Sequence, residues 1–140
     1  MMVERVGFAT QMRSFMDEFY LSEEDLEWLS LKKSEYLSRL IENMDEHDIQ
    51  FEDYFNFESH IPLTLSLPDW STEIIEDKQK IKTFCRTFAE PEVFHQMVIG
   101  ALIPDQDKND VFVPIISFVT RTEKLIKVFS DGKISRPILN

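Results

Sequence analysis

Apolar residues in the first third of the chain recur at the three- and four-residue spacing of an α-helix. The clearest helix start is at Ser22, because serine favours the N-cap and the acidic residues that follow suit the positive end of the helix dipole. The spacing predicts a long helix from about residue 22 to 47 and a shorter one over residues 8–19. The apolar stripe of the long helix consists of Leu26, Leu29, Leu37, Leu40, Ile41 and Met44.

In the middle of the chain, the spacing of apolar residues changes from that of a helix to that of a strand and back again. Residues 61–68 alternate apolar and other side chains, which predicts a strand, and Pro62 and Pro68 make it an edge strand because proline donates no ladder hydrogen bond. Ser71 then favours a second N-cap, with acidic residues early and basic residues late, so a helix is expected over about residues 71–88. Cys85 falls on the apolar face of that helix, as a buried thiol.

The last part of the chain is rich in Val, Ile and Phe, which favour strands. Ser130, Asp131 and Gly132 suit a three-residue hairpin loop, which would pair Val128 with Ile134. A helical interpretation of residues 91–130 stays open, because several of their apolar residues also fit helix spacing. The predicted strands cover residues 93–103, 111–120, 124–129 and 133–138.

The order of these elements predicts an α+β fold in one domain over residues 1–140, with N-terminal helices packed on a C-terminal antiparallel β-meander. An all-α bundle is the alternative. The order is similar to that of NTF2-like proteins, in which helices cover a curved sheet around a pocket. That likeness rests on element order alone, so it implies no site residue.

Negative charge is confined to one half of the chain. Residues 1–80 contain 19 Asp and Glu against 7 Lys and Arg, whereas residues 81–140 contain 7 against 8, and the formal net charge is −11. A field of this kind steers partners rather than performing chemistry. A pI near 4.6 argues against nucleic acid as a ligand, since phosphate contacts need clustered basic residues.

Composition also excludes several kinds of site. The 3 glycines are isolated, which rules out a Gly-rich phosphate loop, and one cysteine rules out an internal disulfide or a multi-cysteine zinc site. No apolar run approaches the ~20 residues of a membrane span, and the first residues lack the apolar core of a signal peptide. We therefore expect a soluble, cytoplasmic protein that contacts no membrane.

Two motifs resemble metal sites without completing one. Residues 105–110 place acceptors as a calcium loop does, but Asp110 stands where glycine is needed and Ile116 where a bidentate glutamate is needed. Glu92 and His95 have the Glu-x-x-His spacing of a di-metal site, which needs two such pairs. We expect no metal and no cofactor, and we interpret His95 as a polar residue of a pocket or of the core.

The acidic half offers a partner-binding surface. Trp28 lies among acidic residues and off the apolar stripe, and tryptophan is frequent at interface hot spots. We expect Trp28→Ala to weaken association while changing stability little. The alternative without a binding role is a solvated helix face that keeps the protein soluble. The candidate partner-binding residues are Glu23, Glu24, Asp25, Glu27, Trp28, Glu52, Asp53 and Tyr54.

Two functional hypotheses follow. The first is a small acidic, non-enzymatic protein of the inhibitor, immunity or chaperone type, which binds a basic protein partner through its acidic N-terminal half. A second copy of the chain is another candidate partner. The second hypothesis is a small-molecule-binding or enzymatic α+β cone, with a pocket formed by the C-terminal sheet and His95. A pocket of several hundred Å³ would distinguish the second from the first.

Overall fold

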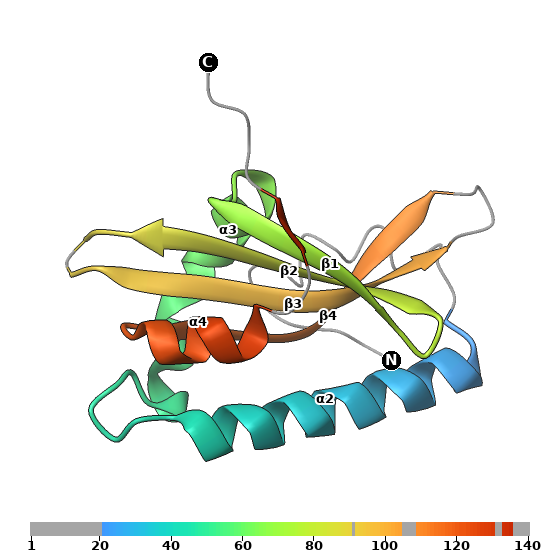
Figure 1. Cartoon of the computed structure of the whole chain (residues 1–140), viewed down its shortest axis with the longest axis horizontal. Coiled ribbons are helices and arrows are strands. Elements are labelled where there is room, and N and C mark those ends of the chain that lie inside the picture. The colour runs from blue at the N-terminus through green and yellow to red at the C-terminus, as the bar shows by residue number, and fades with distance from the viewer. Residues whose placement is uncertain (1–20, 91, 105–108, 131–132, 136–140) are drawn as a thin grey trace.

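The computed structural model describes residues 21–90, 92–104, 109–130 and 133–135. A five-stranded antiparallel sheet in the order β4-β3-β2-β1-β5 forms its centre (Figure 1). N-terminal helices precede a meander of four consecutive strands, so the predicted α+β fold is confirmed. The elements are α2 (Glu23–Asn43), η1 (Phe51–His60), α3 (Ile61–Ser66), β1 (Trp70–Glu76), β2 (Gln79–Phe88), β3 (Phe94–Pro104), β4 (Asp110–Thr120), α4 (Glu123–Phe129) and β5 (Lys133–Ser135).

Helix α2 begins where the sequence predicts. Ser22 is its N-cap, and the Ser22 hydroxyl oxygen accepts a hydrogen bond from the backbone N–H of Asp25 at 3.0 Å. The helix ends at Asn43 rather than near residue 47, so His47 lies beyond it and is exposed. The predicted helix over residues 8–19 lies outside the described residues.

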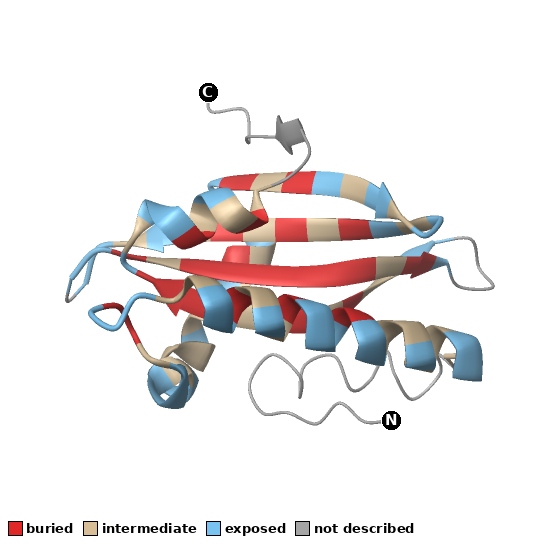
Figure 2. Cartoon of the chain, turned by 60° about the horizontal axis from the view of Figure 1, so that its bottom comes forward, coloured by how far each residue is buried: buried red, intermediate tan, exposed pale blue. Residues whose placement is uncertain are grey.

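The two faces of the sheet carry separate apolar clusters. Helices α2 and α4 lie on one face, over the main cluster that includes Met97 and Phe118 (Figure 1). On the opposite face, Phe94 and Val119 form a smaller cluster with Ile49 and with side chains of η1. Strand β3 is therefore buried over most of its length, as the red central strand in Figure 2 shows.

Gly100 allows the close packing at the centre of β3. A Cβ atom at this position would lie 2.6 Å from the ring of Phe112 and 2.5 Å from the carbonyl oxygen of Val113. The register between β3 and β4 shifts between Ile99 and Gly100. The missing side chain thus lets an aromatic ring and a neighbouring strand approach the backbone.

The predicted helix over residues 71–88 is wrong, because this segment forms the β1–β2 hairpin. Thr72, Thr83 and Cys85 are buried at alternating positions, as in a strand with one inner face. A two-residue turn joins the strands, with φ values of 52° at Asp77 and 69° at Lys78. Positive φ at both residues is the type I′ geometry that matches the twist of a hairpin.

Two predicted strands are helices. Residues 61–66 form α3 instead of an edge strand, because Pro62 occupies a first-turn position, where its missing N–H costs nothing; the helix brings the Thr64 hydroxyl, as donor, to 2.9 Å from the His60 carbonyl. Residues 123–129 form α4, whose Leu125 and Phe129 are buried four positions apart. Val128 therefore does not pair with Ile134.

The other predicted C-terminal strands correspond to β3, β4 and β5. Strands β3 and β4 confirm the predicted segments 93–103 and 111–120, so the all-α alternative is wrong. Strand β5 pairs with β1, where Ile134 lies opposite Thr72. Residues 131–132 of the predicted hairpin loop and residues 105–108 of the calcium-like loop lie outside the described residues.

Candidate functional site

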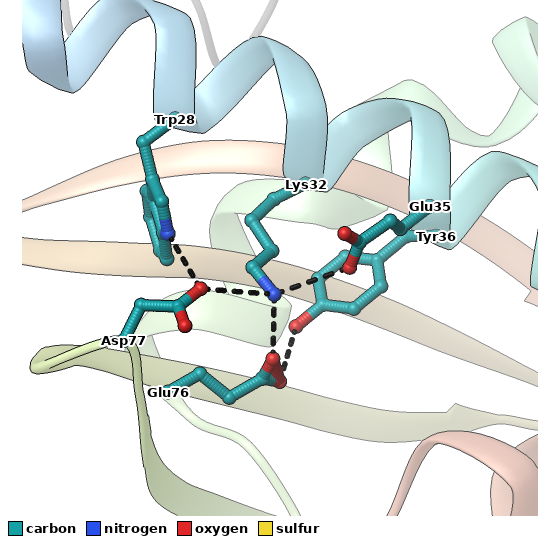
Figure 3. Close-up of polar contacts among 6 residues, drawn as sticks. All are labelled: Trp28, Lys32, Glu35, Tyr36, Glu76 and Asp77. Atoms are coloured by element: carbon teal, nitrogen blue, oxygen red, sulfur yellow. Dashed lines mark hydrogen bonds and ion pairs between the residues drawn. The ribbon is translucent and has the colours of Figure 1, made fainter.

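Lys32 is the centre of a polar network between α2 and the β1–β2 turn (Figure 3). Its ammonium lies 2.7 Å from a Glu76 carboxylate oxygen, 3.1 Å from Glu35 and 3.5 Å from Asp77. The Tyr36 hydroxyl donates to the other oxygen of Glu76 at 3.3 Å. Three carboxylates from two distant segments therefore share one buried cation.

Burial and charge act in opposite directions on Lys32. Burial of the ammonium lowers its pKa, but the hydrogen bonds to Glu76 and Glu35 and the charges of these carboxylates together raise it by more, so the pKa lies above its ordinary value. Lys32 is 5% exposed and carries its charge at neutral pH. A buried charge persists only when it is paired, so this network fixes α2 on the hairpin.

Trp28 belongs to the same network. Its indole N–H donates to Asp77 at 3.1 Å, and the Lys32 ammonium lies 5.8 Å from the indole ring centroid. The hydrogen bond from Trp28, followed by the charge of Lys32, holds the pKa of Asp77 below its ordinary value. Trp28 is half-buried and packs against the main apolar cluster. Part of its surface is thus engaged within the fold.

The outer face of α2 keeps its negative charge because the basic residues of the helix turn inward. Lys32 is buried, and the half-buried Arg39 guanidinium lies 5.1 Å from the Tyr36 ring centroid and 5.6 Å from that of Phe129. Lys33 is the remaining basic residue of α2 and is exposed. Within the helix, Lys33 is therefore the one exposed basic residue beside several exposed glutamates. Besides Glu35, which pairs with Lys32, these are Glu23, Glu24, Glu27 and Glu42.

Segment η1 has a three-residue period, which separates its aromatic residues into inner and outer rows. In a 3₁₀-helix, residues three apart lie above one another. Tyr54, Phe57 and His60 form the half-buried row, and Phe57 lies 4.8 Å, centroid to centroid, from Phe94. Burial, followed by the charge of Asp48, raises the pKa of the Tyr54 hydroxyl, which has no hydrogen-bond partner among the described residues.

The row that contains Phe55 faces outward. Phe55 is 68% exposed and Glu52, one turn before it in the same row, is exposed, whereas Glu58, one turn after it, is half-buried. A 3₁₀ turn rises about 6 Å, which places a carboxylate on each side of the ring. Asp53 is exposed on a neighbouring row. An exposed aromatic ring between two acids is an arrangement suited to a basic partner.

The predicted partner-binding residues form two groups rather than one. Glu23, Glu24 and Glu27 are exposed near the start of α2, whereas Asp25 is half-buried and accepts a hydrogen bond from the Gln79 amide at 3.5 Å. Glu52, Asp53 and Tyr54 lie in η1, beyond the other end of the helix (Figure 1). Since α2 has 21 residues, its two ends are about 30 Å apart.

His95 lies on β3, next to Phe94, whose ring packs against η1. Its ring Nδ1 is 2.8 Å from the Thr87 hydroxyl, and burial lowers the pKa of the imidazole against the opposing charges of Glu123, Asp48 and Asp69. Glu92 pairs with Arg121 at 3.4 Å. Within the described ranges, no group of three or more His, Cys, Asp or Glu side chains could hold a metal ion.

A small hollow lies between α2, α4 and the sheet. Its lining includes Tyr36, Arg39, Thr72, Glu76 and Phe129, and its volume is about 10 Å³. That volume holds about one water molecule, whereas small-molecule pockets occupy hundreds of Å³. The hollow is therefore too small for a metabolite.

In comparisons with known proteins, no protein family, no curated protein and no solved structure matches this chain. None of the helices in the described part of the chain is long and apolar enough to cross a membrane. The function proposed below therefore rests on the residues of the site alone.

Sequence reasoning missed the 3₁₀ structure of η1. The available signal is the ring at every third position, at Phe51, Tyr54, Phe57 and His60. That period is neither the two of a strand nor the 3.6 of an α-helix. It is the period of a 3₁₀-helix, which is uncommon at this length.

Proposed function

We propose that this protein binds a basic protein partner through the acidic surface, defined as the exposed acids Glu23, Glu24, Glu27 and Glu42 of α2 together with Glu52 and Asp53 of η1. One observation carries the proposal. Lys32 and Arg39, which could neutralise this surface, point into the fold instead. The negative field is therefore available to another molecule.

The physical role of such a surface is to accelerate encounter. Clustered charge raises the association rate of an oppositely charged partner, and the effect weakens as salt screens it beyond about 8 Å at physiological ionic strength. The two groups of acids are about 30 Å apart along α2, so a partner that contacts both must be a macromolecule.

The proposed activity is association rather than catalysis, as in inhibitors, immunity proteins and chaperones. The small-molecule alternative would need a pocket, and the hollow beside Tyr36 holds about one water molecule. No observation on the described residues favours that alternative.

Affinity capture from the native host's lysate tests the proposal. The bait is the full chain, compared with the triple variant Glu23→Lys, Glu24→Lys, Glu27→Lys at low and at high salt. The matched control reverses three exposed acids elsewhere, at Glu73, Glu90 and Glu123, of which Glu123 lies in the first turn of a helix as Glu23 and Glu24 do. We expect a basic protein that the wild type and the control retain at low salt and that the triple variant loses. Retention that is indifferent to salt and to the triple variant contradicts the proposal.

A further inference from the structure

We propose that Phe55, with Glu52 and Glu58 on either side, is the position at which an arginine side chain of the basic partner binds. This inference rests on the proposed function and assigns its anchor. The guanidinium stacks on the exposed ring of Phe55, and the two carboxylates receive its N–H groups.

The backbone of η1 supports this assignment. Its 10 residues form a longer 3₁₀-helix than usual, and this geometry keeps Glu52, Phe55 and Glu58 in one row. An α-helix would place residues three apart about 60° out of line. The inner row holds η1 against the sheet through contacts such as Phe57 with Phe94, so the outer row is presented by a fixed element.

What distinguishes Phe55 from the exposed aliphatic side chains is an aromatic face next to acidic residues of the same helix. Phe55 is 68% exposed, although Tyr54 and Phe57 beside it are half-buried. No described cation of this chain stacks on its ring. A bare aromatic face attracts cations through its quadrupole, and carboxylates on both sides strengthen that preference.

Arginine fits this position better than lysine. The guanidinium is planar, stacks on rings, donates in several directions and is more weakly hydrated than an ammonium. Within the chain both kinds of cation lie over rings, since Arg39 lies 5.1 Å from the Tyr36 ring centroid and Lys82 lies 5.1 Å from that of Phe84, so the preference rests on the shape and hydration of the guanidinium. An arginine with further basic residues around it would satisfy both the ring and the neighbouring acids.

Selection of random peptides displayed on phage, with the immobilised full chain as bait, tests the proposal without knowledge of the partner. We expect the enriched sequences to contain arginine among other basic residues. Enrichment of acidic sequences, of apolar sequences without arginine, or of none overturns the proposal. The best peptide is then measured against variants by fluorescence anisotropy.

We expect Phe55→Ala to weaken binding of the peptide by roughly three- to thirty-fold, the range of one cation–π contact, and Phe55→Tyr to retain it. Replacement of the peptide's arginine by lysine should weaken binding to the wild type but not to Phe55→Ala. The matched control is Ile75→Thr, because Ile75 is 70% exposed on a distant strand. Equal affinities of the wild type and Phe55→Ala overturn the inference.

The triple variant of α2 separates this failure from failure of the proposed function. If reversal of Glu23, Glu24 and Glu27 slows association while Phe55→Ala has no effect, the acidic surface stands and the anchor is wrong. If neither variant changes binding, the proposed function itself fails.

Discussion

The two ends of α2 are attached to the sheet in different ways. In its N-terminal half, Lys32 and Trp28 hold the helix on the β1–β2 turn through carboxylates. Beyond its C-terminal end, η1 is fastened by aromatic packing, with Phe57 against Phe94. Ion pairs and a hydrogen bond hold α2 on the turn, whereas burial of aromatic rings holds η1 on the sheet.

This difference decides which groups remain for a partner. Where charge makes the attachment, Glu76 and Asp77 are occupied by Lys32 and by the indole of Trp28. Where rings make the attachment, Glu52 and Asp53 stay exposed beside the bare ring of Phe55. The carboxylates of the hairpin are thus engaged within the fold, whereas those of η1 remain exposed beside an exposed ring.

The largest expected effect is at Lys32. Lys32→Met leaves three carboxylates facing one another without their cation, and we expect a loss of about 3 kcal/mol in the free energy of unfolding, measured by urea denaturation. Lys33→Met is the matched control, because Lys33 is exposed on the same helix, and its effect should stay within about 0.5 kcal/mol. Equal effects of the two substitutions would mean that the network does not hold the helix.

Trp28→Ala should have the next largest effect. The substitution removes a half-buried ring and the hydrogen bond to Asp77, so we expect a loss of about 2 kcal/mol, below the value for a fully buried tryptophan. The sequence alone predicts weaker association with little change in stability. Chemical denaturation of the variant decides between these two expectations.

Ser22→Ala should destabilise the protein by about 1 kcal/mol, because the hydroxyl that accepts the Asp25 N–H is lost. Ser30→Ala is a suitable control, since Ser30 is exposed within the same helix. Thermal melts of both variants measure the difference. A Ser22→Ala protein as stable as the wild type would contradict the cap.

The smallest expected effect is on the pH dependence of stability, through His95 near the contact between η1 and the sheet. Burial lowers the pKa of His95, so the unfolded chain binds a proton at a higher pH than the folded chain does. Stability should therefore fall as pH falls below about 6.5, the ordinary pKa of histidine. His95→Gln should reduce that loss in denaturation curves taken on both sides of this pH. An unchanged pH dependence would show that His95 does not contribute to it.

Local signals in the sequence predict part of this fold. Ser22 and the acids after it identify the start of α2, and β-branched runs identify β3 and β4. The β1–β2 hairpin escapes prediction because its turn has Asp77 and Lys78 at positive φ, where Asn and Gly are expected. Acidic residues before this turn and basic residues after it also imitate a helix dipole pattern.

The candidate site is only partly predictable for a different reason. The acids of α2 and η1 can be found from charge, but whether a side chain is exposed depends on packing between distant segments. Lys32 looks like a surface residue in sequence, yet Glu76 and Asp77 from the hairpin bury it. Tyr54 and Phe55 both follow acidic residues in sequence, yet the period of η1 turns Tyr54 inward and Phe55 outward.

One paired measurement tests the central claim, that Phe55 serves recognition while Trp28 serves the fold. The free energy of unfolding and the dissociation rate of an arginine-containing basic peptide are determined for Phe55→Ala and for Trp28→Ala. We expect Phe55→Ala to keep stability within about 0.5 kcal/mol of the wild type and to speed dissociation several-fold, whereas Trp28→Ala loses stability. A Phe55→Ala protein that unfolds as readily as Trp28→Ala and releases the peptide at the wild-type rate would contradict the claim.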